Sequence, residues 1–558
     1  MYRTIKFRFP FQQFELEDDD GDLALTLTDL RMIELSYALR SKPSWWTKCM
    51  DPTIRAKWKE EALQHEIRDG KLSEAEVDWV LDELEDFAKM RDDATGIQPS
   101  CHIRVYESDK LIPEQLKANL VAAAAVFENV PEEDKDWHPR SDNMVLDLVH
   151  PSLFCTVYGR TLAWTTDRDG KRHFELLKPP VQDQESWSYS EKFSWIPTDF
   201  QLGENGEPAK VLGHINNVHP EHHKELVPVI EGLVGRFSLL WDRVLTDLYP
   251  ANDATLPGRG RVVGMYKWEE TENSPPRPAW KEYQELGTEE YNRRYRAWEE
   301  SRAIVVPTVD KRGYRASGGN IAHREHTYSI QGKKVQVIVK LANIHLTPEK
   351  PEYPGGKWHV EGMANERIVA SGIYYYDSEN ITESQLAFRQ PVSFADVAYE
   401  QSDGRGIELT WGLEEGAGSN QVVGAVKTSA DRCIAFPNIY QHQVSSFKLV
   451  DLSKPGHRKI VALFLVDPEK RIPSTSDIPP QQVDWAREAI RESLVKDDKS
   501  VKVPLPVELA DMVADRVDSV MTLDEAKVYR EQLMDERTAF VGVVDEMHFA
   551  TEFSFCEH

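Results

Sequence analysis

The stretch K-L-A-N-I-H-L-T-P-E-K-P-E-Y-P-G-G-K-W-H-V-E-G, residues 340–362, decides how the rest of the chain is interpreted. It begins as an apolar run typical of a β-strand, breaks at a proline- and glycine-rich turn, and ends in His359-Val360-Glu361. Side chains of a strand alternate between its two faces, so His359 and Glu361 point one way and Val360 points the other. The stretch therefore predicts a strand that carries an imidazole and a carboxylate on one side.

A histidine further along the chain completes a set of metal ligands. His442 lies in F-P-N-I-Y-Q-H-Q-V-S-S-F, residues 436–447, which also has the composition of a strand. Two histidines and one carboxylate form the facial triad that holds Fe(II) and leaves coordination positions open. We therefore predict that His359, Glu361 and His442 bind iron and form the catalytic centre.

An arginine on the next predicted strand is the expected anchor for a co-substrate. Arg458 follows a turn at residues 453–456. Its guanidinium is planar, keeps its charge and binds carboxylates through two hydrogen bonds. We predict that Arg458 holds the far carboxylate of 2-oxoglutarate, whose keto acid end suits the open positions of the iron.

The spacing of the histidine–glutamate pair is weak evidence by itself. The sequence contains five His-x-Glu pairs, and only the pair at His359 follows a Gly-Gly turn and precedes an apolar strand, residues 368–376. An alternative is that His359 and His442 are ordinary strand histidines, hydrogen-bonded within a sheet. A further group of histidines either holds a second metal or opens a helix at His219-Pro220. The members of this group are His214, His219, His222 and His223.

The composition excludes several classes of protein. With 558 residues, 40% hydrophobic residues and 15 tryptophans, the chain can form a large globular interior. A net charge of -27, from 67 basic and 94 acidic residues, argues against nucleic acids and anionic membranes as partners. The sequence contains no run of about 20 apolar residues, so no membrane span is predicted. Five scattered cysteines and an N-terminus without a signal-peptide core predict a cytoplasmic protein, whose oligomeric state stays open.

The order of predicted elements indicates an α+β fold with a double-stranded β-helix, or cupin-like jelly roll, as its core. Residues 321–475 contain about eight short strands with alternating apolar residues and turn breaks, as in that architecture. Helical periodicity predicts an N-terminal helical region at 1–100 and a C-terminal helical extension at 476–558. Residues 101–320 form a mixed α/β region. Its polar stretch near 250–320 is either a lid over the active-site mouth or a surface helix without a role in turnover.

Several long phrases resemble one known family and together cover nearly the whole chain. The most specific are K-P-S-W-W-T-K-C-M-D-P-T-I-R-A-K-W-K-E-E-A (42–62), H-P-S-L-F-C-T-V-Y-G-R-T (150–161), K-W-H-V-E-G-M-A-N-E-R-I-V-A-S-G-I-Y-Y-Y-D-S-E-N-I-T (357–382) and K-P-G-H-R-K-I-V-A-L-F-L-V-D-P (454–468). The family consists of fungal proteins formerly of unknown function, whose core resembles Fe(II)/2-oxoglutarate-dependent dioxygenases. The resemblance implies Fe(II) and 2-oxoglutarate as cofactors and oxidation of an unactivated C–H bond of a small molecule by O2.

The resemblance also indicates a substrate class and a co-substrate contact. A free amino acid is one implied substrate, with hydroxylation, desaturation or aziridine-type cyclisation of a valine-like compound in secondary metabolism as outcomes. Related folds carry Asn-x-Tyr before the metal strand, and this chain has Asn343-Ile344-His345 there, so Asn343 and His345 are expected to bind the co-substrate. The carboxylate ligand is glutamate, where aspartate is commoner.

Four further residues are candidates for the substrate pocket. Arg367 stands where the family pattern has a histidine, and Arg367 and Arg389 are expected to bind a substrate carboxylate. Tyr374 and Tyr376, on the strand after the metal pair, are expected to contact the substrate. For Arg367, the alternative is an ordinary surface strand residue.

Other functions remain open at this point. One is a cupin-type metalloenzyme that uses no 2-oxoglutarate, and another is a non-catalytic binding protein with a relict metal site. Hydroxylation of a protein or histone is a third, although the acidic composition and the long 250–320 stretch oppose it.

Overall fold

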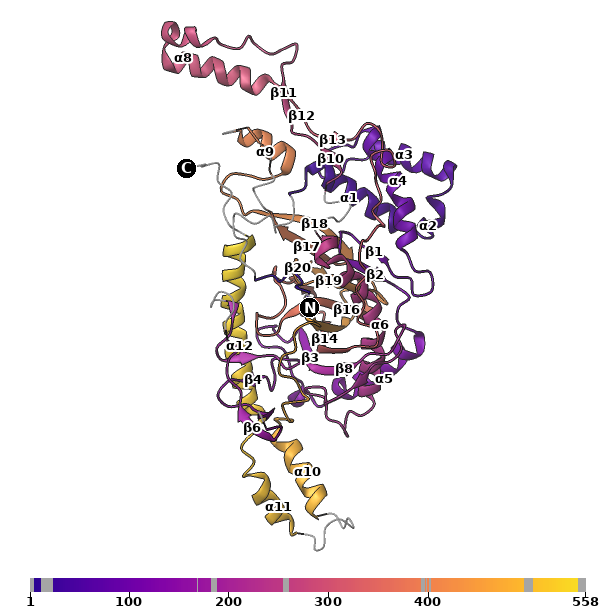
Figure 1. Ribbon diagram of the computed structural model, residues 1–558, viewed down its shortest axis with the longest axis vertical. Helices are drawn as coiled ribbons and strands as arrows, with labels where there is room; N and C mark the ends of the chain where they lie inside the picture. The colour runs from indigo at the N-terminus through magenta and orange to yellow at the C-terminus, as the bar shows by residue number, and fades with distance from the viewer. Residues whose placement is uncertain are drawn as a thin grey trace.

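The computed structural model describes residues 5–11, 24–167, 169–181, 188–253, 260–392, 397, 399–400, 403–495 and 505–549. Antiparallel sheets form the centre of the molecule, and helices lie toward both ends of the chain (Figure 1). The predicted α+β class is therefore confirmed. Parts of the predicted N-terminal region and C-terminal extension lie outside the described residues.

The N-terminal region is helical, as the periodicity predicts. Its helices are α1 (Leu27–Arg40), α2 (Trp45–Lys48), α3 (Pro52–Gln64) and α4 (Glu74–Met90). α4 begins at a capping box, in which Ser73 Oγ accepts the N–H of Glu76 while the Glu76 carboxylate accepts the N–H of Ser73. The apolar side of α4 is buried against α1 and α3. These helices pack beside the sheet and contribute no candidate metal ligand.

Nine antiparallel strands form the main sheet. Their order is β1-β2-β19-β16-β22-β14-β8-β9, and β3 also pairs with β14. The bounds are β1 (Gln98–Pro99), β2 (Tyr106–Ser108), β3 (Val145–Val149), β8 (Thr198–Gln201), β9 (Lys210–Val211), β14 (Lys334–Leu346), β16 (Ile368–Glu379), β19 (Cys433–Pro437) and β22 (Gly456–Val466). Five of these strands come from residues 98–211, so the region expected to precede the β-rich core shares its sheet.

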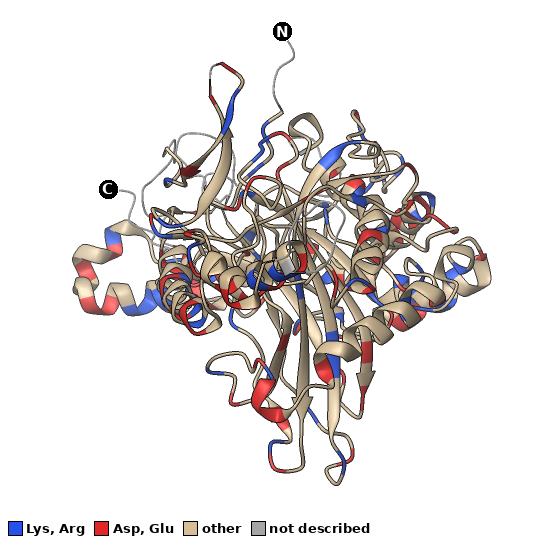
Figure 2. Cartoon of the chain, turned by 90° about the horizontal axis from the view of Figure 1, so that it is seen from below, with Lys and Arg blue, Asp and Glu red and all other residues tan. Residues whose placement is uncertain are grey.

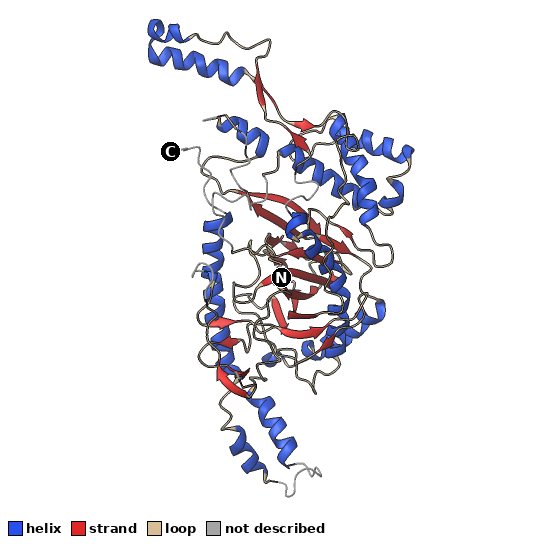
Figure 3. Cartoon of the chain, viewed as in Figure 1, coloured by secondary structure: helices blue, strands red, loops and turns tan. Residues whose placement is uncertain are grey.

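Two helices cover the outer face of the main sheet, α5 (Glu114–Glu128) and α6 (Leu226–Asp247). Phe237 of α6 packs directly on Gly372 of β16, where a Cβ atom would lie 2.5 Å from the phenyl ring. A glycine is needed there because a side chain would push the helix off the sheet. Figure 3 shows α5 and α6 beside the strands.

A smaller sheet lies against the inner face of the main sheet. It consists of β18 (Asn420–Lys427), β17 (Gln385–Pro391) and β20 (Gln441–Val444), in that order. Phe388 of the small sheet meets Phe436 of β19 with ring centroids 5.0 Å apart, and Arg458 of β22 reaches across to Ser384. The short pair β15 (Glu352–Tyr353) and β21 (Phe447–Lys448) adjoins it.

The stretch 250–320, expected to be either a lid or a surface helix, forms a projecting arm in its described part. α8 (Trp280–Ser301) projects beyond the sheets on the two-stranded ribbon β11 (Lys267–Glu269) and β12 (Ala303–Val305), as Figures 1 and 3 show. The lid hypothesis for 250–320 is not supported, because this arm extends away from β20. The helix that runs along the open side of the sheets is α12 (Leu523–Val544).

The remaining elements are short or peripheral. They are α7 (Pro250–Asp253), α9 (Gly404–Trp411), α10 (Val483–Val495), α11 (Val507–Ala514), the single turns η1 (Glu132–Asp134) and η3 (Asp545–Phe549), and the strands β4 (Thr156–Val157), β5 (Leu162–Thr166), β6 (Arg172–Leu176), β7 (Phe193–Ser194), β10 (Val262–Val263) and β13 (Thr308–Val309). Figure 2 shows acidic and basic residues interspersed along the peripheral helices, while the central strands are mostly uncharged. Among the described helices, none combines the length and apolar character that a bilayer crossing needs.

Candidate metal centre

Backbone pairing brings the two predicted histidine ligands together. His359 donates its N–H to the carbonyl of His442 at 3.2 Å, and His442 donates back at 2.9 Å. The predicted strand around His359 is reduced to this single bridge beside β20. Directly opposed residues carry their side chains on the same face, and the two imidazole centroids lie 4.3 Å apart.

Glu361 completes the cluster from the same side. Its Oε1 lies 3.7 Å from Nε2 of His359 and 3.3 Å from Nε2 of His442. The three ligand atoms all lie within 4.8 Å of one another. Ligand atoms that share a metal at about 2.1 Å are themselves roughly 3 to 3.5 Å apart, so this spacing suits one ion. The predicted set His359, Glu361 and His442 therefore converges.

The hydrogen bond of His359 leaves its inner nitrogen available. Nδ1–H of His359 donates to the carbonyl of Lys357 at 2.8 Å. The neutral ring then carries its proton on Nδ1 and a lone pair on Nε2, the atom that faces Glu361. Histidine ligands of metals commonly donate their other N–H to a backbone carbonyl in this way, which fixes the ring orientation. The donor set and its outer hydrogen bond both fit a divalent transition metal.

Asn438 holds the main chain of the carboxylate ligand. Its Oδ1 accepts the N–H of Glu361 at 2.8 Å, and its Nδ2 donates to the carbonyl of Glu361 at 2.9 Å. A further bond from Nδ2 to the carbonyl of Ile368 ties the same amide to β16. Asn438 is buried, so this double contact fixes where the Glu361 side chain starts.

The charges of the cluster are set by mutual contact. Burial works to raise the pKa of Glu361, but the two imidazoles hold it well below its usual range. Burial, together with the charge of His359, lowers the pKa of His442. Burial works to lower the pKa of His359, but the contact with Glu361 outweighs burial and raises it. A carboxylate and at least one neutral imidazole are thus present at neutral pH, which is the state that binds metals.

Arg458 is a buried cation without an acidic partner. Its Nη1 donates to Ser384 Oγ at 2.8 Å and to Thr428 Oγ1 at 3.4 Å. The guanidinium lies 4.3 Å from the ring centroid of Phe447 and makes no ion pair with any carboxylate in the described part of the chain. Its Nε is buried without a hydrogen bond, and burial lowers the pKa of the side chain. An anionic ligand would supply the missing charge.

The structure does not bring Asn343 and His345 to Arg458. Asn343 Nδ2 donates to Glu128 of α5 at 2.8 Å, on the outer face of the main sheet. Asn343 pairs across the sheet with Lys459, and Ile344 pairs with Arg458. Because faces alternate, Asn343 and His345 point away from Arg458. The expected role of these two residues in co-substrate binding is therefore corrected.

The same alternation separates the predicted tyrosines from the inner face. Tyr376 donates its hydroxyl to Asn343 Oδ1 at 3.3 Å, and Tyr374 reaches Asp431 at 3.5 Å. Tyr375, between them, lies under the Arg458 guanidinium at 5.7 Å. The expectation that Tyr374 and Tyr376 contact the substrate is corrected, since the tyrosine on the inner face is Tyr375.

Both predicted substrate arginines are engaged elsewhere. Arg389 forms an ion pair with Asp545 near the C-terminus, and its Nε donates to Gln441 at 2.6 Å. Arg367 donates to the hydroxyl of Tyr189 at 3.2 Å from a backbone position with φ of 48°. Neither guanidinium is directed at the triad by these contacts, so their expected role in binding a substrate carboxylate is not supported.

Two other groups of side chains have metal-like spacing. One is His138, Asp147 and His150, and the other is His219, His222 and Glu488. The second group contains two members of the predicted histidine cluster, while His223 Nδ1 accepts the backbone N–H of His219 at 3.1 Å. His219 Nδ1 accepts the N–H groups of residues 221 and 222. These bonds hold a turn that precedes α6, which begins at Leu226, so His219-Pro220 does not open the helix itself. The four histidines do not form one metal site.

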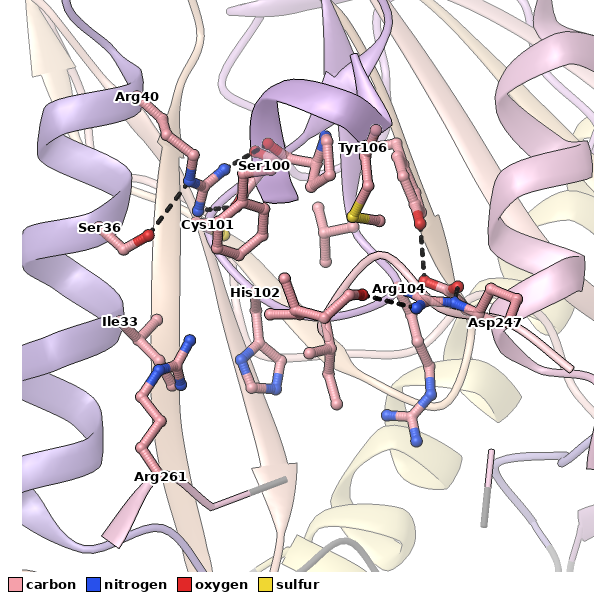
Figure 4. Close-up of a pocket in the computed structure, with 17 residues that line it drawn as sticks. Ile33, Ser36, Arg40, Ser100, Cys101, His102, Arg104, Tyr106, Asp247 and Arg261 are labelled. Carbon is pink, nitrogen blue, oxygen red and sulfur yellow. Dashed lines mark hydrogen bonds and ion pairs between the residues drawn. The ribbon is translucent and has the colours of Figure 1, made fainter. Parts of the chain in front are cut away.

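A small cavity lies between the N-terminal helices and the sheet (Figure 4). Four arginines line it, among them Arg261, which bonds both carboxylate oxygens of Glu83, and Arg324, which pairs with Asp247. Arg40 donates to backbone carbonyls at the sheet edge, and Figure 4 shows Arg104 directed away from the centre of the cavity. Arg104 donates to the hydroxyl of Tyr440, so the four guanidinium groups have separate partners.

Sequence reasoning missed four residues of the site. They are Asn438, Ser384, Thr428 and Tyr375. Asn438 lies in the same phrase as His442, and a buried asparagine beside a metal strand was the available signal. Ser384 and Thr428 had none, because their approach to Arg458 depends on the small sheet crossing the large one.

The fold and the site define an α+β protein with a candidate two-histidine, one-carboxylate metal centre. The chain belongs to the family described as "Protein of unknown function (DUF4246)", whose model matches residues 74–489. The model described as "Domain of unknown function DUF4246, N-terminal" matches residues 5–61.

Two further comparisons add little. Among curated proteins, no match is found. Among solved structures, the crystal structure of a bsmA homolog from Methylobium petroleophilum PM1 is similar at 8% identity, over 63% of this chain and 84% of that one, with a TM-score of 0.22. A likeness at that level carries no argument about fold or function.

Proposed function

We propose that this protein is an Fe(II)- and 2-oxoglutarate-dependent oxygenase. The observation that carries the proposal is the pairing of two features on facing sheets. One is the cluster of His359, Glu361 and His442. The other is Arg458, a buried cation that pairs with no described carboxylate and donates to the hydroxyls of Ser384 and Thr428. A metal and an anion are the ligands that these two features lack.

We further propose that the sheets form a double-stranded β-helix. The main sheet and the small sheet face each other across the ring contact of Phe388 with Phe436 and the bond from Arg458 to Ser384. All named strand pairs of both sheets are antiparallel, which that architecture requires. The open side between the sheets would then be the entrance to the site, with α12 beside it.

Each residue has a definite part in the proposed reaction. Bound Fe(II) would supply the activation of O2 and the oxidation of an unactivated C–H bond. His359, Glu361 and His442 would hold the ion on one side and leave its other side open. Arg458, assisted by Ser384 and Thr428, would bind the far carboxylate of 2-oxoglutarate and orient its keto acid end toward the metal.

The proposed substrate is a small molecule, with free amino acids as the first class to test. The net charge of -27 disfavours nucleic acid. Hydroxylation, desaturation and aziridine-type ring closure of a valine-like substrate are the proposed outcomes, and the cytoplasm is the proposed location. No bound partner other than the substrate and O2 is part of the proposal.

Anaerobic reconstitution tests the function directly. Purified protein is loaded with Fe(II) and 2-oxoglutarate without air, mixed with a panel of free amino acids, and exposed to O2 while succinate is measured. Succinate release stimulated by one amino acid supports the oxygenase. Oxidation without succinate would indicate a 2-oxoglutarate-independent metalloenzyme, and metal binding without any turnover would indicate a binding protein.

A further inference from the structure

Lys340 occupies an unusual position in the main sheet. It lies in the middle of β14, opposite Ala462 of β22. Lys340 and Ile344 are separated by an even number of residues, and Ile344 is the cross-strand partner of Arg458. Lys340 therefore shares the inner face of the sheet with Arg458. In the sequence, Lys340 stands at the centre of an apolar run, residues 335–346.

The ammonium of Lys340 makes no direct contact with a carboxylate among the described residues. Lys340 makes no hydrogen bond or ion pair within the described residues, and it is not among those with an undescribed contact. The residues before and after it on β14 are buried, whereas Lys340 itself is partly exposed. A partly exposed side chain at the centre of a covered sheet implies an open space on the inner face. The central strands carry few other charges (Figure 2).

Lys340 faces the same space as the candidate metal ligands. On the inner face, the row next to Lys340 runs through Phe464 of β22 and Ser371 of β16 to Phe436 of β19. The ring centroid of Phe436 lies 4.8 Å from that of His442. Asp147 lies opposite Ala342 on β3 and so shares this face. Asp147 is buried, and its Oδ1 has no hydrogen-bond partner among the described residues. Lys340 thus shares the inner face with the residues beside the metal cluster and with an incompletely bonded carboxylate.

We propose that Lys340 binds a carboxylate group of the substrate beside the metal centre and thereby determines specificity. This inference rests on the proposed function. Arg458 is not the same subsite, because four residues along a strand separate their rows by about 13 Å. Lys340 takes the role of binding the substrate carboxylate that was predicted for Arg367 and Arg389, because their guanidinium groups already have other partners. Lysine suits this task as a compact cation on a flexible stem.

Three variants test the role of Lys340. Lys340→Met removes the charge at similar volume, and Lys340→Arg keeps a cation. Lys334→Met is the matched control, because Lys334 is the exposed first residue of the same strand. Because Lys340 has no partner to lose, Lys340→Met is expected to unfold at the same temperature as the wild type.

Binding is measured on protein loaded with redox-silent Ni(II) and 2-oxoglutarate. The probes are radiolabelled amino acids and 2-hydroxy acids, each compared with its carboxamide by equilibrium dialysis. The wild type is expected to prefer the acid to its carboxamide by at least tenfold. Lys340→Met is expected to abolish that preference, Lys340→Arg to retain part of it, and Lys334→Met to leave it unchanged.

Several outcomes would overturn the inference. One is a wild-type protein that binds acids and carboxamides equally, or binds neither. Another is a Lys340→Met protein that keeps the preference for the acid. A third is a Lys340→Met protein that keeps this preference but loses affinity for 2-oxoglutarate. The last result would assign the cation to the co-substrate. Failure of the proposed function is distinguishable, since it appears as absent Ni(II) or 2-oxoglutarate binding in the wild type itself.

Discussion

Two histidine–carboxylate clusters of this protein have similar spacing and different hydrogen bonding. In both the triad of His359, Glu361 and His442 and the group of His138, Asp147 and His150, the ligand atoms lie within 4.8 Å of one another. In the triad, His359 donates Nδ1–H outward and keeps Nε2 for the interior. Proximity alone would rank the two clusters equally.

In the second cluster, the imidazole of His150 has no lone pair free for a metal. His138 Nδ1 bonds Asp147 Oδ2 at 2.7 Å. His150 Nδ1 accepts the N–H of Ser152 at 3.2 Å, so the neutral ring carries its proton on Nε2 and has no lone pair left for a metal. The comparison teaches that the outward hydrogen bond of each ring, more than the distance between ligand atoms, separates a candidate metal centre from a hydrogen-bond network.

The largest expected effect follows from removing one ligand of each cluster. His359→Ala is expected to reduce bound iron from about one ion per chain to near zero, because two remaining ligands hold Fe(II) weakly. His138→Ala, the matched change, is expected to retain the iron. Metal content after gel filtration in Fe(II)-containing anaerobic buffer measures both. Loss of iron from both variants would mean that the clusters do not differ in the proposed way.

The second prediction concerns the two faces of β22. Arg458→Met is expected to weaken 2-oxoglutarate binding roughly 10- to 150-fold, since charged hydrogen bonds are worth about 1.5–3 kcal/mol. Lys459→Met alters the next residue, which faces the opposite side and pairs with Glu128. It is expected to leave the affinity unchanged. Calorimetric titration of the Ni(II)-loaded proteins decides, and equal losses in both variants would remove Arg458 from the proposed site.

The third prediction tests the support of Glu361. Asn438→Ala removes both bonds to the main chain of Glu361 and is expected to lower iron affinity about 10- to 100-fold. Asn343→Ala is the control, since Asn343 is also a buried asparagine but lies on the outer face. Competition with a metal chelator measures the affinity. An unchanged affinity in Asn438→Ala would make this residue structural only.

His359 and Glu361 were predictable as a pair because a local rule places them together. Alternation places His359 and Glu361 on one side of a short extended segment, and the Gly-Gly turn marks where that segment begins. The α+β class follows from helical and strand periodicities that the structure retains. Arg458 was predictable because a lone arginine opens a long apolar strand.

The second layer of the site was not predictable, for two physical reasons. A shift of one residue in the strand register moves every side chain to the opposite face of the sheet. Only the pairing of β14 with β22 shows that Lys340, and not Asn343, lies on the inner face. The same uncertainty led to Tyr374 and Tyr376 in place of Tyr375. Long-range contacts are the other reason, since Ser384 meets Arg458 across 74 positions of sequence.

The last prediction concerns the pH dependence of stability that the second cluster contributes. Burial lowers the pKa of His150 to about 3, from about 6.5 in the unfolded chain. The unfolded state therefore binds the proton more readily between these values. The stabilising contribution is complete above pH 6.5 and decreases toward pH 3, by about 1.4 kcal/mol per pH unit.

His150→Asn tests this contribution, because the asparagine oxygen can still accept the N–H of Ser152 while the titrating ring is gone. Urea unfolding at pH 7, 6 and 5 is expected to show a free energy of unfolding that falls less steeply in the variant. Part of the slope should persist, since burial also lowers the pKa of His214 and His345 to about 4. Equal slopes in both proteins would show that His150 is not held neutral, and the contrast between the two clusters would then lose its basis.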